Sequence, residues 1–297
     1  MTMSITTEEL YAIEKHLCDL AINVIGPIVN SKKSNKTESW TLKTGEKKVD
    51  IVTKIDKEVE LIIFSDLRQK YPQFKFIGEE SYDPENPPVL TDDPTFIIDP
   101  IDGTTNFVHD FPFFCTSMGL TYQKKPVVGV IYNAERNLLV SATTGKGVRV
   151  NGEQQDALIA KDVMLSKSIV ALQPGSQREG NNFEVKMDTY KQLLSCNGGM
   201  IHGARNISSS AMSLAYLALG YLDAYWDGGC YSWDVTAGWC ILYETGGIAV
   251  GANPGEWDIQ VDSRSYLFVR GGSSKEAQKQ YVLDFWKNVK GELSYGA

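Results

Sequence analysis

The sequence predicts a layered α/β fold in which two sheets alternate with helices in the order helix, sheet, helix, sheet, helix. Apolar residues keep helical spacing near the N-terminus of the 297-residue chain. The middle changes to short strands joined by turn-rich connections, and the remainder alternates strands with helices. We expect two halves, residues 1–155 and 156–297, packed closely as one structural unit.

The N-terminal segment is expected to begin with an amphipathic helix. Thr6 and Glu9 form the pattern of a capping box, and we expect the helix to end near Gly26 and Pro27. Helical spacing predicts that its buried face carries Leu10, Ile13, Leu17, Leu20 and Val24. Residues 31–48 are polar without sustained periodicity, so a surface loop is expected there.

The other elements follow from changes in apolar period. A second helix is expected from about residue 56 to residue 71, because Pro72 stops it. Short strands of an antiparallel meander are expected at 74–77, 96–98, 115–122, 127–132, 138–143 and 148–150. In the second half we expect strands at 169–172 and near 224, and helices at 183–194, 208–219, 234–244 and 274–289.

Composition limits the possible partners. The chain has 29 Lys plus Arg against 37 Asp plus Glu, a net charge of -8, which disfavours non-specific binding to nucleic acid or anionic lipid. An anionic substrate would therefore need a bound cation at its site. The five cysteines contain no C-x-x-C pair, and the N-terminus has no signal-peptide pattern. We expect a cytoplasmic protein that binds neither nucleic acid nor membranes.

Two acidic groups follow predicted strands. Glu79 and Glu80 come after the first strand of the meander, and Asp99 and Asp102 come after the next. Taken alone, the glutamates suit a solvated loop and the aspartates suit an Asx-turn or helix cap. Together they could bind one cation, to which the Ile101 carbonyl could add a ligand. All-oxygen donors favour Mg²⁺, Ca²⁺ or Mn²⁺ over zinc.

The residues after Asp102 point to phosphate chemistry. Gly103 allows close approach of the backbone to a ligand, and N–H groups near Thr104 and Thr105 could hold an anion. A third acidic signal, Asp227 and Asp234, lies among aromatic residues, and Asp234 is also expected to cap the helix after it. The chain has no H-E-x-x-H, G-x-S-x-G, Walker A or G-x-G-x-x-G match, which leaves metallopeptidase, α/β-hydrolase, kinase and Rossmann functions without support.

These segments resemble the inositol monophosphatase family of magnesium-dependent, lithium-sensitive phosphatases over nearly the whole chain. The resemblance rests on residues 76–81 (FIGEES), 97–107 (IIDPIDGTTNF), 232–238 (SWDVTAG) and 50–56 (DIVTKID). It implies a five-layered α-β-α-β-α sandwich and a homodimer. It also implies roughly two or three Mg²⁺ ions per site, the first held by Glu79, Asp99 and the Ile101 carbonyl. A second would be held by Asp99, Asp102 and Asp234.

The resemblance also implies roles for other residues. Thr104, hydrogen-bonded to Asp56, would orient the attacking water, with Glu80 helping through the metal-bound water shell; Asp56 could equally cap its own helix. The implied substrate contacts are Gly103, Thr104, Thr105, Ser208, Ser209, Ser210, Asp227 and Asp234. Two positions depart from the family, which commonly has Glu in place of Asp227 and Gly in place of Ser208.

The implied reaction is the hydrolysis of myo-inositol monophosphates to myo-inositol and inorganic phosphate by metal-activated water. A bisphosphate nucleotidase or sugar phosphatase would share the metal residues, so these remain alternatives within the superfamily. A non-catalytic scaffold that binds metal or inositol phosphate is a further alternative. It is disfavoured because no metal ligand and no water-positioning threonine is lost.

Overall fold

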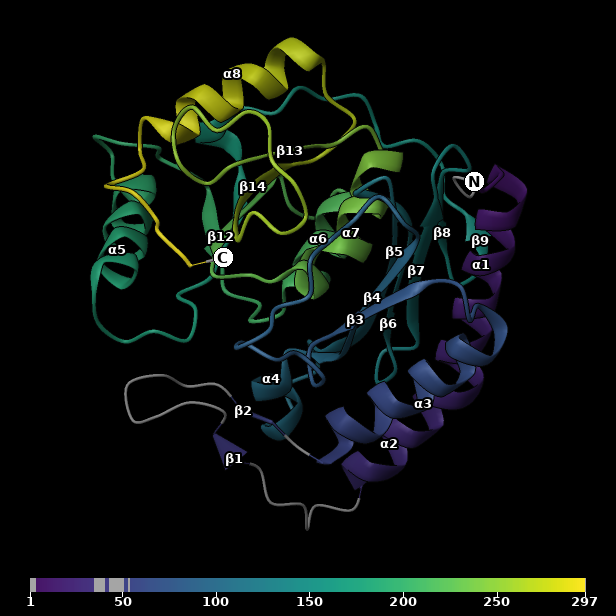
Figure 1. The fold of residues 1–297 in the computed structure, drawn as a ribbon. Helices are drawn as coiled ribbons and strands as arrows, with labels where there is room; N and C mark the ends of the chain where they lie inside the picture. The colour runs from purple at the N-terminus through teal and green to yellow at the C-terminus, as the bar shows by residue number, and fades with distance from the viewer. Residues whose placement is uncertain (1–3, 35–40, 43–50, 53, 297) are drawn as a thin grey trace.

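The computed structural model describes residues 4–34, 41–42, 51–52 and 54–296, and its core contains two sheets separated by helices (Figure 1). The larger sheet has seven strands in sequential order. They are β3 (Lys75–Gly78), β4 (Thr95–Asp102), β5 (Cys115–Tyr122), β6 (Lys125–Asn133), β7 (Leu138–Thr143), β8 (Val148–Val150) and β9 (Glu153–Gln154). The prediction that 74–77 belongs to the antiparallel meander is wrong, because β3 pairs in parallel with β4; the strands from β4 to β9 form the meander as expected.

The second sheet has five strands in the order β11-β10-β12-β14-β13. They are β10 (Ile169–Leu172), β11 (Gly203–Arg205), β12 (Ala224–Gly228), β13 (Ile248–Val250) and β14 (Ser265–Val269). β10 is parallel to β11 and β12, whereas β14 is antiparallel to β12 and β13. A separate antiparallel pair joins β1 (Thr41–Leu42) to β2 (Ile51–Val52).

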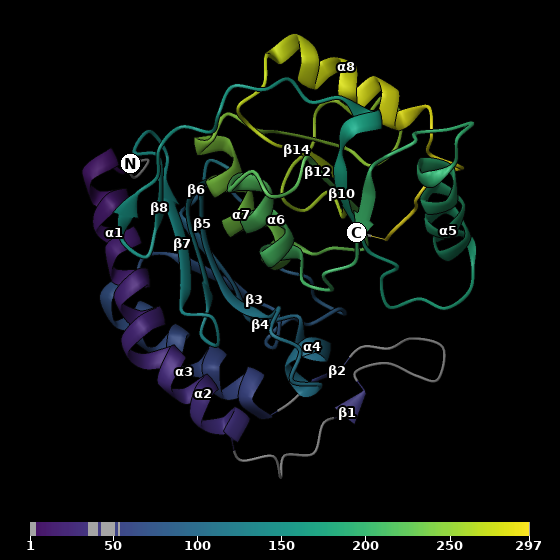
Figure 2. The ribbon, with the colours of Figure 1, turned by 180° about the vertical axis from the view of Figure 1, so that it is seen from behind.

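Helices form the other three layers, as the two opposite views show (Figures 1 and 2). The outer face of the seven-stranded sheet is covered by α1 (Thr7–Leu20), the π-helical turn Ala21–Ile25, α2 (Gly26–Ser34) and α3 (Lys54–Lys70). Between the sheets lie α6 (Ser210–Ala218) and α7 (Ser232–Glu244). The far side carries α5 (Asn181–Leu194) and α8 (Lys275–Trp286). The predicted layered α/β fold is therefore confirmed.

Two short helical segments complete the described elements. They are α4 (Thr104–Val108), directly after β4, and a 3₁₀ turn at Leu165–Lys167. No helix in the described ranges combines the length and apolar character needed to cross a bilayer.

The first helix does not end where the sequence predicts. Gly26 keeps helical dihedral angles (φ -54°, ψ -51°), and α2 runs on through Pro27 to Ser34. The wider π-helical turn lies directly before the proline, where a regular helix would lose a hydrogen bond. The π-helical turn contains one residue more than an α-helical turn, which changes the direction of the side chains after it. Val24 is therefore 37% exposed rather than buried. The predicted 31–48 loop therefore starts later than expected, and most of it lies outside the described residues.

Other boundaries also differ. The helices predicted from residues 56, 208 and 234 begin at Lys54, Ser210 and Ser232. Asp234 is thus not an N-cap, since its carboxylate reaches back from the first turn to the Tyr231 N–H, 2.6 Å away. Strands β11, β13 and β14 were not predicted, because two have only three residues and β14 is an apolar run without alternation.

A buried carboxylate fastens the outer helix layer to the seven-stranded sheet. Glu14 on α1 is 1% exposed. It accepts hydrogen bonds from the hydroxyls of Ser141 at 2.8 Å and Thr143 at 2.6 Å, and Arg149 Nη1 lies 3.3 Å away. Because its charge is paired and its oxygens are bonded, this acid can remain in the interior.

Two glycines set how closely α7 approaches the seven-stranded sheet. Gly119 on β5 and Gly129 on β6 face each other across the strand pair. A Cβ atom at Gly129 would lie 2.1 Å from the Ala237 carbonyl oxygen, and one at Gly119 would lie 2.5 Å from Thr236 Cγ2. The missing side chains thus form a shallow groove for α7. Because Asp234 lies one turn before Ala237, this groove also fixes the position of Asp234.

We predict that Gly129→Ala destabilises the protein by about 3 kcal/mol, because the added methyl group meets rigid backbone on α7. Gly145→Ala is the matched control: it has open space but a φ of +78°, so only backbone strain of about 1 kcal/mol is expected. Urea denaturation measures both free energies. If both variants lost the same free energy of unfolding, the packing of α7 would not depend on the groove.

Candidate active site

Three carboxylates from two distant segments meet between the sheets. Asp99 and Asp102 lie on β4 and Asp234 lies on α7, yet each offers an oxygen within 4.8 Å of the others. Residues three apart on a regular strand point to opposite faces. Here the pairing shifts, because Asp99 pairs with Ser117 and Asp102 pairs with Cys115. The extra residue on β4 is a bulge that brings both aspartates to one side.

Asp99 and Asp102 are buried and Asp234 is partly buried, and within the described ranges no ion pair joins any of the three to a basic side chain. Asp99 Oδ1 is buried and has no hydrogen-bond partner among the residues that the structure describes. Burial first, and the charges of Glu79 and Asp102 next, raise the pKa of Asp99 well above its ordinary value. Burial, together with the charges of Asp102 and Glu79, does the same to the pKa of Asp234. A cation would remove this repulsion, and an all-oxygen donor set suits a hard divalent ion.

Asp102 also connects the two sheets through the start of α6. It accepts hydrogen bonds from the Ser209 hydroxyl at 2.5 Å and from the Ala211 N–H at 2.6 Å. Burial raises the pKa of Asp102 to about 6, although these hydrogen bonds favour its charged form. Ser209 in turn caps α6 by accepting from the Met212 N–H. The Ser209 hydroxyl, expected to contact substrate, is therefore already committed to Asp102 and the helix.

The turn that carries Glu79 and Glu80 is supported from α3. The Glu80 N–H donates to Glu60 Oε2 at 2.8 Å, and Gly78 packs so closely on Glu60 that a Cβ atom there would overlap its carboxylate. Sequence reasoning missed Glu60. The available signal was its spacing, because Asp56 and Glu60 are four residues apart on one helix and share a buried face.

Thr104 stands between the helix layer and the carboxylates. Its hydroxyl lies 3.1 Å from Asp56 Oδ1 and 3.0 Å from the Ile101 carbonyl oxygen, and Asp56 is fully buried. Gly103 precedes it with φ +89°, a left-handed conformation that favours glycine. One small pocket is lined by Glu79, Asp99, Ile101, Asp102, Gly103, Thr104, Thr105, Ser208 and Asp234. The structure thus brings these predicted residues together.

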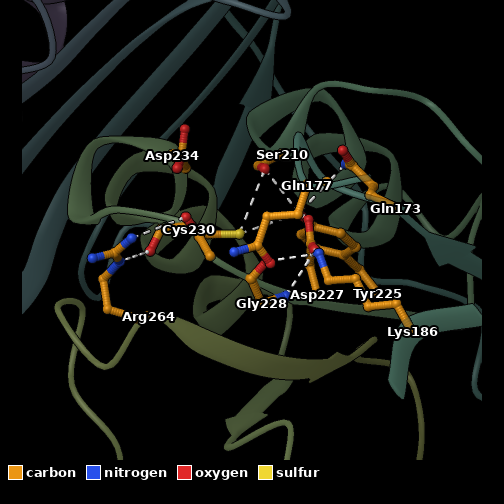
Figure 3. A network of polar contacts seen from close by, with 12 residues as sticks. Gln173, Gln177, Lys186, Ser210, Tyr225, Asp227, Gly228, Cys230, Asp234 and Arg264 are labelled. Atoms are coloured by element: carbon orange, nitrogen blue, oxygen red, sulfur yellow. Dashed lines mark hydrogen bonds and ion pairs between the residues drawn. The ribbon is translucent and has the colours of Figure 1, made fainter. Parts of the chain in front are cut away.

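Two more predicted residues lie in an adjoining pocket, whereas Asp56, Glu80 and Ser209 line neither pocket. Asp234 lines both pockets, and the second is also lined by Ser210 and Asp227. Figure 3 shows Lys186, Tyr225 and Asp227 meeting there, with Arg264 beyond Cys230.

Asp227 is held by groups that sequence reasoning missed. Lys186 Nζ lies 2.7 Å from Asp227 Oδ1, and the Tyr225 hydroxyl donates to Asp227 Oδ2 at 2.9 Å. Lys186 is 3% exposed. Burial alone would lower the pKa of its ammonium group, but the charge and hydrogen bond of Asp227, together with Tyr295 and Cys230, leave the pKa above its ordinary value. The sequence signal was weak: Lys186 shares the buried face of α5 with Val185 and Leu193, but also with the polar Asn182 and Thr189.

This layered fold, with a carboxylate-rich pocket between its sheets, is typical of a metal-dependent phosphatase. The sequence profile of the inositol monophosphatase family matches residues 7–290, and the chain belongs to that family. Inositol monophosphatase 1 of Saccharomyces cerevisiae is 61% identical over 295 residues, which cover 97% of this chain and 99% of that protein.

Solved structures show the same fold. The extragenic suppressor protein suhB of Bartonella henselae superimposes with a TM-score of 0.77 at 25% identity, covering 95% of this chain and all of that chain (100%). The staphylococcal SaIMPase-II with inositol monophosphate bound gives a TM-score of 0.70 at 25% identity, covering 92% and 93% of the two chains.

We predict that the metal-free protein loses stability as pH rises from about 4 through 6 and above. The folded carboxyls with raised pKa values hold protons that the unfolded chain releases, so the folded state is favoured at lower pH. Asp99→Asn removes one such group and should raise the melting temperature in EDTA at pH 7.5, by about 2–4 °C per kcal/mol gained.

The control is Asp93→Asn. Asp93 is exposed, and its pKa is lowered by hydrogen bonds from Lys75 and Thr91, so its replacement should not give this gain. Calorimetry at pH 5.5 and 7.5 measures the difference. An Asp99→Asn protein that is less stable than wild type in EDTA would contradict the explanation by buried repulsion.

Proposed function

We propose that this protein hydrolyses myo-inositol monophosphates to myo-inositol and inorganic phosphate, with Mg²⁺ as its metal. The observation that carries the proposal is the convergence of Asp99, Asp102 and Asp234 on one pocket, next to a second pocket that contains Asp227. The likeness to yeast inositol monophosphatase 1 supports this choice of substrate.

The metal ligands proposed for roughly two or three Mg²⁺ ions are Glu79, Asp99, Asp102, Asp234 and the Ile101 carbonyl. The unpartnered Asp99 oxygen and the hard donor set fit this assignment. When bound, Mg²⁺ neutralises charge on the phosphoryl group and lowers the pKa of a coordinated water.

The protein then has to orient that water and hold the ester. A threonine hydroxyl has one hydrogen, and if Thr104 donates it to Asp56, its oxygen can accept a hydrogen from the water. Glu80 would assist through the surrounding water. Gly103 and Thr105 would meet the phosphate, while Ser208, Ser210, Asp227 and Asp234 would surround the alcohol. Ser209 would act indirectly, by holding Asp102 and the start of α6 in place. On this proposal the halves 1–155 and 156–297 act as one unit: the first carries most of the metal ligands, and the second carries Asp234 and contacts to the alcohol.

The first experiment measures phosphate release from inositol 1-phosphate with and without Mg²⁺. We expect Mg²⁺-dependent release that millimolar Li⁺ inhibits, and a loss of at least about a thousandfold in Asp99→Asn, because one metal ligand loses its charge. A large preference for 3′-phosphoadenosine 5′-phosphate would instead indicate a bisphosphate nucleotidase. Mg²⁺ binding without release from either ester would indicate a scaffold.

We predict that Thr104→Ala lowers kcat by about a hundredfold while the Mg²⁺ concentration for half-maximal activity changes less than threefold, because the hydroxyl positions water. Thr104→Ser keeps the hydroxyl and should restore most of the activity. Steady-state kinetics over a Mg²⁺ series separates the effects. If Mg²⁺ dependence shifts as far in Thr104→Ala as in Asp102→Asn, Thr104 supports the metal site rather than the water.

We further propose that the protein works in the cytoplasm as a homodimer. The resemblance to the family supports the dimer, and the cysteine usage supports a reducing compartment. Light scattering of the purified protein gives its molar mass, and a monomer at micromolar concentration would contradict the dimer. Secretion of a tagged full chain would contradict the location.

A further inference from the structure

The residues that follow α8 return to the pocket that contains Asp227. Tyr295 is among the residues that line this pocket. The family profile ends at residue 290, so the wall that Tyr295 forms in this pocket comes from a segment that the profile does not match.

Two asparagine side chains from separate parts of the chain hold this segment. Asn182 on α5 donates to the Ser294 carbonyl at 2.7 Å and accepts from the Ser294 N–H at 2.9 Å. Asn253 makes the same two contacts with Leu293, at 3.0 Å and 2.8 Å. Leu293 is 4% exposed, so an apolar contact adds to the four hydrogen bonds. The segment is therefore fixed against the body of the protein.

Tyr295 packs on two consecutive glycines. A Cβ atom at Gly228 would lie 2.6 Å from the Tyr295 ring, and one at Gly229 would lie 2.9 Å from it. The ring can approach the backbone this closely only because both positions lack side chains. Arg264 fixes the same loop from the other side, since it donates to the Cys230 carbonyl at 2.9 Å and to the Gly296 carbonyl at 2.9 Å.

The Tyr295 hydroxyl lies near the buried ion pair of the pocket. Partial burial raises the pKa of this phenol, while the Lys186 charge lowers it and the Asp227 charge raises it. Lys186 itself donates to Asp227 and to the Gly228 carbonyl, both at 2.7 Å. A phenol edge, a carboxylate and backbone groups of the 228–230 loop thus surround one space, which opens toward Asp234.

We infer that Tyr295 is a specificity-determining residue, which closes the alcohol end of the substrate pocket around a compact cyclic polyol. The apolar ring of Tyr295 suits the C–H groups of a saturated ring, and Asp227 can accept from ring hydroxyls. The same wall leaves less room for a nucleoside. This inference rests on the proposed function, because it assumes that the alcohol of the ester occupies this pocket.

The test compares Tyr295→Ala and Tyr295→Phe with wild type. The KM for inositol 1-phosphate should rise about tenfold in Tyr295→Ala, with kcat within threefold, because the wall binds the alcohol and not the reacting phosphate. The inhibition constant of inorganic phosphate, which reports the metal end, should stay within twofold. The preference for inositol 1-phosphate over adenosine 2′-phosphate should fall about tenfold. Tyr295→Phe should keep most of that preference.

Two further variants distinguish loss of the Tyr295 wall from a general loss of stability. Asn182→Ala removes a clamp without touching the pocket, so it should shift KM in the same direction as Tyr295→Ala. Tyr190→Ala, at an exposed tyrosine of α5, should change neither constant. A KM within twofold of wild type in Tyr295→Ala, or an equal rise in the phosphate inhibition constant, would overturn the inference. No phosphate release by wild type would instead overturn the proposed function, and with it this inference.

Discussion

The architecture depends on keeping like charges close together in the interior. Asp99 and Asp102 come from β4, and Asp234 comes from α7 about 130 residues later, yet their oxygens lie within 4.8 Å of one another. At such distances, away from bulk water, repulsion between carboxylates is strong. The chain must therefore hold them by rigid contacts until a cation is bound. The bulge in β4 and the glycine groove beneath α7 supply those contacts.

The second sheet is placed by the same group of residues. Asp102 accepts from the first turn of α6, where backbone N–H groups carry partial positive charge. The helix that packs between the sheets is thereby oriented by a residue of the metal pocket. Ser209 joins this contact to its own capping bond with the Met212 N–H. Stability and metal binding consequently share residues, and this explains why several candidate ligands also have structural hydrogen bonds.

Features that depend on residues close together in the sequence could be predicted. Glu79, Asp99 and Asp102 follow apolar runs that indicate strands, and the capping box of the first helix involves only Thr6 and Glu9. The continuation of the first helix through Pro27 was missed, because a π-helical turn is a tertiary adjustment that propensity does not encode. The partners of Asp227 were also missed. Lys186 lies 41 residues away on another element, and only the packing of α5 against β12 brings the two charges together.

If the proposed function holds, the two pockets divide the work between binding and chemistry. The pocket of Asp99 and Asp102, here called the metal pocket, is lined by carboxylates, a carbonyl and small residues. The pocket of Asp227, here called the alcohol pocket, is built from the second half and contains a neutralised acid. Because Lys186 balances Asp227, the alcohol pocket adds little net charge to a chain that already carries -8, and phosphate must be attracted by the cation. Contacts in the alcohol pocket can therefore differ between relatives and change substrate preference while the metal pocket stays intact. Asp234 is the exception: it lines both pockets, so movement of α7 would affect metal and alcohol together.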